Sequence, residues 1–220
     1  MSGQQKLQHA DDNGEHKLLQ QLQKSFKIVQ KCLSAWCEVL TEIRPHLVML
    51  NNLTEQFTSC HSTTNAQLAA LTSQLPDVKD KLLHKLQQEV DAKLIIIQEK
   101  LCMLHGLCEK ISKQCKYSAD LYMKNCAMLD LTAVTTATTT RPSISDMLEW
   151  LQDTEQVFLQ RYWARTYILD QFRLDNNTTH LSDNVIWNGN DKDIRKQFQG
   201  KYSGNQEKLP YLSFFLEEKL

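Results

Sequence analysis

The chain has 220 residues, enough for one domain or one and a fraction, and 41% of them are hydrophobic. Its 25 basic and 26 acidic residues leave a net charge of −1, so no strong overall field favours nucleic acid or an anionic membrane. Only 6 glycines and 4 prolines are present, too few for the many tight turns of a β-sandwich or barrel. We therefore expect an all-α protein.

The sequence also indicates in which kind of compartment the protein works. No apolar run approaches the roughly 20 residues needed to cross a bilayer, and residues 1–16 lack the apolar stretch of a signal peptide. Seven cysteines without a secretory signal are interpreted as reduced thiols. We expect a soluble intracellular protein.

The first long helix is predicted after a polar, disordered tail over residues 1–14. Its apolar residues recur in alternating steps of three and four, the heptad pattern, and include Leu19, Leu22, Phe26, Val29, Leu33, Trp36, Leu40, Ile43, Leu47 and Leu50. Additional apolar residues such as Leu18 and Cys32 widen this stripe to about three positions in seven, which favours a bundle over a free coiled coil. Pro45 interrupts the helix without shifting the stripe, which predicts a kink with helix on both sides.

A second long helix is predicted from Pro76 to about Leu129. Pro76 suits a first helical position, and acidic residues in the following turn favour the helix dipole. The turn from Leu94 to Ile97 is apolar on all sides and is expected to be covered by more than one neighbour, either the third helix or a partner. Together the two helices predict a long antiparallel hairpin over residues 15–131.

The C-terminal part is predicted to begin with a linker at residues 132–142, where threonines are abundant and poorly suited to a helix. A third helix follows from Ser143 to about Phe172, with Ser143 and Asp146 in the positions of a capping box. Beyond it, residues up to 220 are predicted to form a loop with a short helix near 192–198, followed by a docked apolar tail at 209–220.

Three aromatic residues of the third helix, Trp150, Trp163 and Tyr167, lie off its main apolar stripe. They are either anchors for a partner or partly exposed residues that cover the hairpin, and the sequence leaves both interpretations open.

Catalytic and cofactor chemistry finds no support in the motifs. Cys102, His105 and Cys108 are spaced by three along one helix, so their side chains fan around it and cannot close a zinc site alone. The glycines lack the spacing of a phosphate-binding loop, and no local signature singles out a nucleophile. We expect a protein that is not an enzyme and has no catalytic residues, cofactor or metal.

A block of residues at the start of the third helix resembles the signature of the AIRIM family. It comprises Pro142-Ser143, the run DMLEWLQD over residues 146–153, Glu155, Tyr162 and Tyr167. The run SFFLEE at residues 213–218 is similar to that family's C-terminus, and weaker similarity covers the first helix and the start of the second.

This resemblance implies a small helical ribosome-maturation factor. Its expected partners are a hexameric AAA-type ATPase similar to Drg1, a second small helical subunit similar to CINP and, indirectly, the pre-ribosomal particle, without direct contact to nucleic acid or membrane. The implied roles are an adaptor function in large-subunit maturation and in replication-linked protein turnover. Candidate partner-binding residues lie in the third helix and the tail: Asp146, Met147, Leu148, Trp150, Leu151, Trp163, Tyr167, Phe214 and Phe215. The alternative is a structural coiled-coil subunit of a kinetochore-, tether- or microtubule-type complex.

Overall fold

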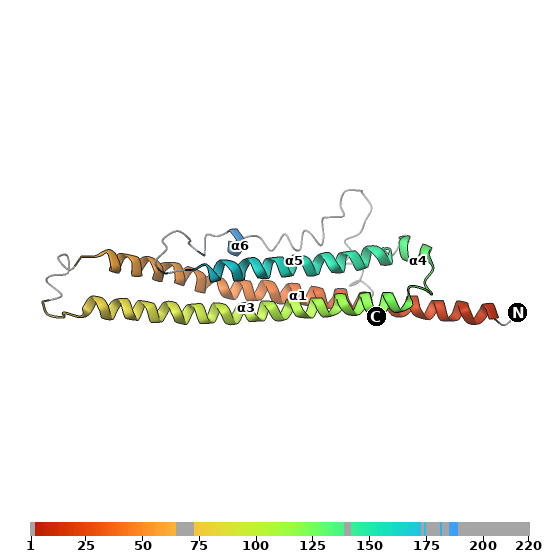
Figure 1. Cartoon of the computed structure of the whole chain (residues 1–220), viewed down its shortest axis with the longest axis horizontal. Helices are drawn as coiled ribbons and strands as arrows, with labels where there is room; N and C mark the ends of the chain where they lie inside the picture. Colours follow the sequence, from red (N-terminus) through yellow and green to blue (C-terminus); the bar gives the residue numbers. More distant parts are fainter. Residues whose placement is uncertain are drawn as a thin grey trace. The chain divides into compact units, whose positions relative to one another are not determined.

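The computed structural model describes residues 3–64, 73–138, 142–172, 174, 181 and 185–188, of which residues 3–13, 133, 185 and 188 are described by their backbone alone. All regular structure within these ranges is helical, which confirms the all-α prediction. The helices are α1 (Gly3–Ser62), α3 (Val78–Asn125), α4 (Leu131–Thr135), α5 (Ile144–Asp170) and α6 (Val185–Asn188) (Figure 1).

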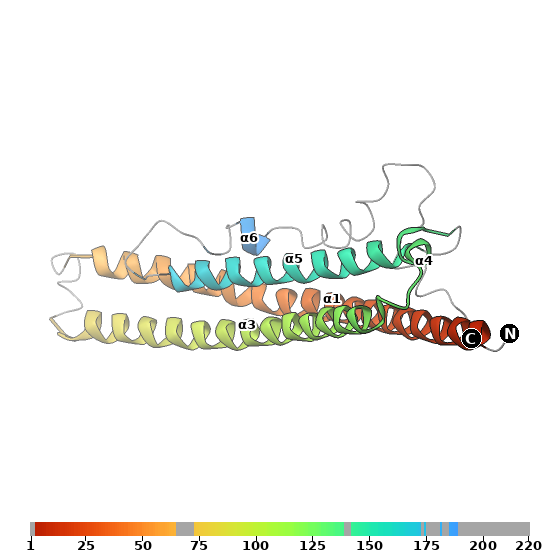
Figure 2. The same cartoon turned by 45° about the vertical axis from the view of Figure 1, so that its right-hand side comes forward.

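The chain divides into two compact units. Unit 1 consists of residues 1–36, 106–160 and 190–220, and unit 2 consists of residues 37–105 and 161–189. Each of the three long helices α1, α3 and α5 therefore contributes one segment to each unit. Within each unit these three segments run side by side, with α3 antiparallel to α1 as the predicted hairpin requires (Figure 2).

The core of unit 1 is formed by the apolar stripes of three helix segments. Trp36 is fully buried, and its ring meets that of Phe158 of α5 edge-on, with 4.9 Å between centroids. Other side chains that are buried here come from α1, α3 and α5: Leu18, Leu22, Phe26, Val29, Leu107, Cys108, Ile111, Ile144, Met147 and Leu151. The heptad stripe of the first helix thus performs the core role that its spacing predicts.

A polar layer crosses this otherwise apolar core between α1 and α3. The Gln21 side-chain amide donates to Ser25 Oγ at 3.0 Å and to Gln114 Oε1 at 3.3 Å. The hydroxyls of Ser25 and Ser118, both without solvent exposure, lie 3.1 Å apart. Every member is bonded to another member, so the layer is satisfied from within.

The core of unit 2 is also formed by three helix segments, but the polar contacts between them differ from those of unit 1. Buried side chains include Ile43, Leu47, Leu50, Val90, Ile97, Leu101, Leu104 and Leu169. Lys100 of α3 forms a 2.6 Å ion pair with Glu42 of α1. Lys79 donates from Nζ to the carbonyl oxygens of His61, at 3.1 Å, and Thr63, at 2.6 Å. A cation from α3 therefore caps the carboxyl end of α1, where the helix dipole favours positive charge.

Several boundaries differ from the predictions. The helix α1 begins at Gly3, so residues 3–14 are helical and not a disordered tail. Residues 4–12 contain no proline or β-branched residue, and extending an existing helix costs far less than starting one. The predicted linker holds one short helix, α4, whose N-cap Asp130 accepts from the amide of Thr132. The third helix ends at Asp170, two residues before the expected end.

The structure also shows how single positions and the ends of the long helices compare with the predictions. The helix α1 continues through Pro45, as the unbroken stripe predicts. Leu40 is only partly buried although it lies on the heptad stripe. In the turn from Leu94 to Ile97, Ile97 is fully buried whereas Ile95 is 56% exposed, so the chain itself covers only part of the turn and cover by a partner stays a prediction. The second helix ends at Asn125, four residues early. The predicted elements at 192–198 and 209–220 lie outside the described residues.

Candidate interaction site

The DMLEWLQD block begins with a helix start. The amide of Asp146 donates to Ser143 Oγ at 3.0 Å, which confirms Ser143 as the cap of α5. Ser145 then donates to the carbonyl of Val134 at 3.2 Å, so the same turn ties α4 to α5 within unit 1. The first residues of this block therefore fix where the third helix begins and what it follows.

Three predicted partner-binding residues of this block lie in the core of unit 1. Met147 is 0%, Leu151 1% and Trp150 7% exposed. Asp146 and Leu148 are partly buried. The covering interpretation of Trp150 therefore holds for the isolated chain, and Trp150 does not project as a surface anchor. Phe214 and Phe215 lie outside the described residues.

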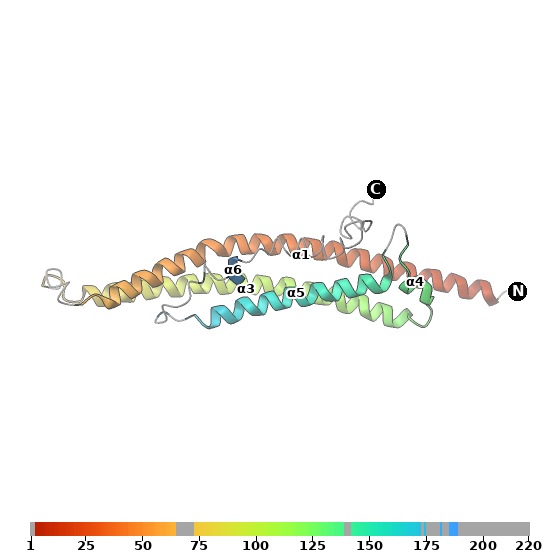
Figure 3. The same cartoon turned by 90° about the horizontal axis from the view of Figure 1, so that it is seen from above.

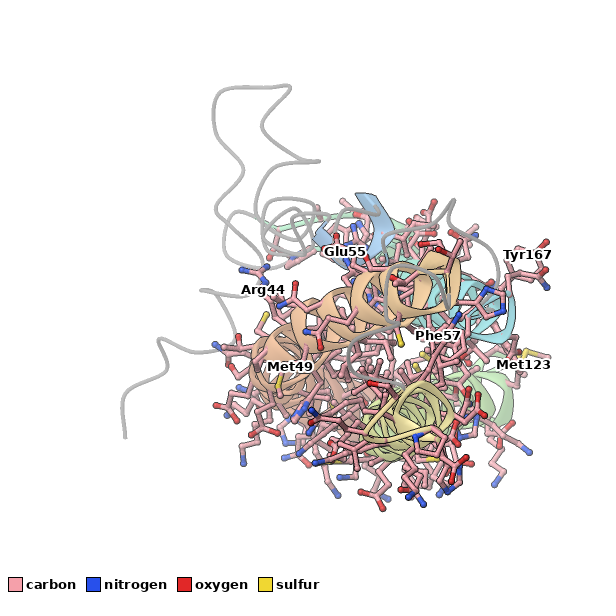
Figure 4. All side chains as sticks on the ribbon, turned by 90° about the vertical axis from the view of Figure 1, so that its left-hand side faces the viewer. Arg44, Met49, Glu55, Phe57, Met123 and Tyr167 are labelled. Atoms are coloured by element: carbon pink, nitrogen blue, oxygen red, sulfur yellow. The ribbon has the colours of Figure 1, made fainter. Side chains whose placement is uncertain are left out.

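The other two aromatic candidates are on the surface of unit 2. Trp163 is 58% and Tyr167 66% exposed, and they are one helical turn apart on α5. Figure 4 shows Tyr167 projecting from the edge of the molecule. The ring of Trp163 lies 5.1 Å from that of Tyr162, which in turn lies 5.0 Å from the His105 ring of α3. A short row of rings thus leads from α3 to an exposed aromatic pair.

The cysteine and histidine residues with metal-like spacing differ in their surroundings. Cys102 is exposed, His105 packs on Tyr162, and Cys108 is only 1% exposed. Burial raises the pKa of Cys108 to about 12, in keeping with a thiol packed among apolar side chains. No cluster of three metal-binding side chains occurs within the part of the chain that the structure describes.

Two further cysteines of unit 1, the buried Cys32 and the half-buried Cys115, pack against the helices. Burial raises the pKa of Cys32, with Lys110 acting in the opposite direction. Burial is also the main cause that raises the pKa of Cys115, and Glu155 adds to it. The Cys115 thiol donates to the carbonyl of Leu151 at 3.1 Å. The position of Cys108 and Cys115 on the apolar stripe therefore predicts their packing role correctly.

A feature that the sequence analysis missed lies on unit 2, where Leu181 and α6 pack against the helices. The Leu181 amide donates to Asn51 Oδ1 of α1 at 3.1 Å. Trp187 of α6 is 6% exposed, with the guanidinium carbon of Arg165 5.9 Å from its ring centroid. The available signal was the presence of Leu181, Ile186 and Trp187 in an otherwise polar stretch.

Among the described residues, no helix is long and apolar enough to span a bilayer.

Comparison with known proteins now identifies the family. The model of a family described as "Ribosome biogenesis protein C1orf109-like" matches residues 16–198. The chain belongs to this family. The match takes in α3 and α5 in full and α1 from residue 16 onward, so it includes segments of both units.

Curated relatives carry one shared name, "AFG2-interacting ribosome maturation factor". The human protein is 28% identical over 197 residues, which are 90% of this chain and 94% of the relative. The Xenopus tropicalis protein is 31% identical over 150 residues, 68% of this chain and 72% of its own. The mouse protein is 28% identical over 197 residues, 90% and 88% of the two chains. The resemblance read from the DMLEWLQD block is thereby confirmed.

Proposed function

We propose that this member of a ribosome biogenesis family is a non-enzymatic adaptor subunit that binds an AFG2-type AAA ATPase. The observation that carries the proposal is that relatives matched over most of their length are named for interaction with AFG2. Large-subunit maturation in the cytoplasm and nucleus is the proposed setting, and a second small helical subunit similar to CINP is the proposed co-partner.

The exposed aromatic pair of unit 2 is the surface to which we assign ATPase binding. Trp163 and Tyr167 are the residue types most often found to dominate the energetics of protein interfaces. The neighbouring ring of Tyr162 packs against Trp163 and limits its freedom, which reduces the entropy lost on binding. Met147, Trp150 and Leu151 are core residues of unit 1 and are not part of this surface.

The test is a pull-down of the AFG2-type ATPase from the protein's own cells with Trp163→Ala and Tyr167→Ala. A hot-spot residue truncated to alanine costs at least about 2 kcal/mol, so we expect roughly thirtyfold weaker binding for Trp163→Ala. Tyr117→Ala is the matched control, because Tyr117 is a 60% exposed aromatic on unit 1. It is expected to bind like the wild type.

The outcomes separate the parts of this proposal. Unchanged binding by the Trp163→Ala and Tyr167→Ala double variant would show that the ATPase binds elsewhere on the chain. Failure of the wild-type chain to recover any AAA ATPase would remove the adaptor function itself and favour a structural coiled-coil subunit.

A further inference from the structure

The segment that follows α5 places a small cover on unit 2. We define the cover as Leu181 together with α6, which lies over α1 and α5 (Figure 3). Leu181 is 1% and Trp187 6% exposed, whereas Ile186, their neighbour on the outer side, is 37% exposed. Two apolar side chains of the cover are thus inserted and one is left outside.

The residues beneath the cover are polar. Asn51 of α1 is 7% exposed and accepts the hydrogen bond from the Leu181 amide. Arg165 of α5 is 1% exposed and has the Trp187 ring over its guanidinium group. Arginine and asparagine on a bundle helix normally face solvent. Their contacts here indicate a site shaped for two things, a backbone N–H on the Asn51 oxygen and an aromatic face on the Arg165 cation.

The cover is held less firmly than the three long helices. The four residues of α6 are far too few to form a stable helix without tertiary contacts. The Trp187 Nε1–H is buried and meets no acceptor within the described parts of the chain, a cost that opposes docking. Segments held by few contacts open locally while the rest of a protein stays folded.

We propose that the cover is releasable and occupies in cis a second docking site, made by Asn51 and Arg165, which an aromatic-bearing segment of the AFG2-type ATPase takes over in addition to binding the exposed aromatic pair. This inference rests on the proposed function. The chemistry that holds Trp187 is the chemistry that recognises the partner's aromatic residue. Only chains with an open cover can bind the partner at this site. The apparent affinity is therefore the affinity of the open chain multiplied by the fraction of chains that are open.

Hydrogen exchange on the full-length chain tests release. We expect the Leu181 amide to exchange at least about tenfold faster than core amides such as those of Leu22 and Ile111, and Trp187→Ala to accelerate it further. Ile186→Ala, which removes an outward-facing side chain of the same helix, is expected to leave the rate unchanged. Exchange of Leu181 only at the rate of the core would overturn the inference, because the cover would then open only with global unfolding.

Binding to the purified ATPase tests the partner. Trp187→Ala is expected to bind about tenfold more tightly than the wild type and Ile186→Ala equally tightly, because removing the indole raises the open fraction. A synthetic peptide of residues 181–188 should compete with the ATPase for the Trp187→Ala chain. The same peptide with alanine in place of its tryptophan should not compete.

The possible failures are distinguishable. Equal or weaker ATPase binding by Trp187→Ala, with the wild type bound, would overturn this inference and leave the adaptor function standing. If neither chain binds the ATPase, the proposed function fails and the assignment of the partner falls with it, while the exchange rate of Leu181 still decides whether the cover opens.

Discussion

The two units solve the same problem, polar side chains inside a helical bundle, in opposite ways. In unit 1, Gln21, Ser25, Gln114 and Ser118 bond to one another directly between α1 and α3. In unit 2, Asn51 accepts from the Leu181 amide, 130 residues further along the chain, and Arg165, which also donates to the carbonyl of Arg161 at 3.2 Å, lies against the Trp187 ring. A layer satisfied by the packed helices persists as long as they stay packed, whereas one satisfied by a short segment depends on that segment staying in place.

The two units also differ in what fixes the register of α1 against α3. A fully bonded polar layer penalises any shift of α1 along α3, because a shift would bury unpaired groups. In unit 2 the polar contacts described above between α1 and α3 lie towards the surface, at the ion pair of Glu42 with Lys100 and at the capping Lys79. Exposed pairs of this kind contribute little to stability. Register in unit 2 therefore depends mainly on its apolar side chains.

The largest expected effect comes from the core of unit 1. Trp36→Ala should lower the free energy of unfolding by about 3–5 kcal/mol, since it leaves a large cavity beside Phe158. Denaturant unfolding followed by circular dichroism measures this loss. The exposed neighbour Ser34 offers a control, and Ser34→Ala should stay within about 0.5 kcal/mol of the wild type. A loss below about 1 kcal/mol for Trp36→Ala would mean that unit 1 is not the firmly packed region described here.

The polar layer is tested by a double-mutant cycle. Ser25→Ala should cost about 1–3 kcal/mol, because it removes the acceptor of the Gln21 amide and the partner of the buried Ser118 hydroxyl. Adding Ser118→Ala should cost less than the sum of the two single changes, with a coupling of at least about 0.5 kcal/mol. Strict additivity in denaturant unfolding would show that the two hydroxyls do not act as one layer.

A smaller and strictly local effect is expected in unit 2. Asn51→Ala removes the acceptor of the Leu181 amide and should favour opening of the cover by about 1 kcal/mol, or roughly fivefold in exchange of that amide. Asn52→Ala, at an exposed position next to it, is the control. The contrast between the units requires that core amides of unit 1 exchange unchanged in the Asn51→Ala chain. Acceleration there as well would mean that the cover stabilises the whole chain.

The smallest effect concerns the end of α1. Lys79→Met keeps most of the aliphatic stem but removes the cation that caps the carbonyls of His61 and Thr63, and should cost about 0.3–1 kcal/mol. Thermal unfolding at low salt measures it, because salt screens a cation at a helix end. Lys81→Met, at an exposed position in the same turn, should cost less. Equal losses for the two variants would assign no capping role to Lys79.

What the sequence predicts well is what depends on spacing alone. The heptad stripe locates the core residues of α1, and the serine cap locates the start of α5 to within a residue. Trp150 was harder to place, because a helix packed between two others buries a wider arc than one stripe, and Thr154 on the same side is also buried. The polar layer was missed because serine and glutamine are usually exposed, so their spacing alone does not show that they are buried between two helices. The cover was missed because its contacts join residues far apart in the chain.

One consequence of the two-unit organisation concerns how the protein can be taken apart. Each long helix contributes one segment to each unit, so both units combine stretches of chain that are far apart in the sequence. No single cut releases either unit as a contiguous fragment with all its helices. Truncations that stop within α1, α3 or α5 should therefore yield unfolded or aggregating products. Functions of the two units are separable only by substitutions at single positions.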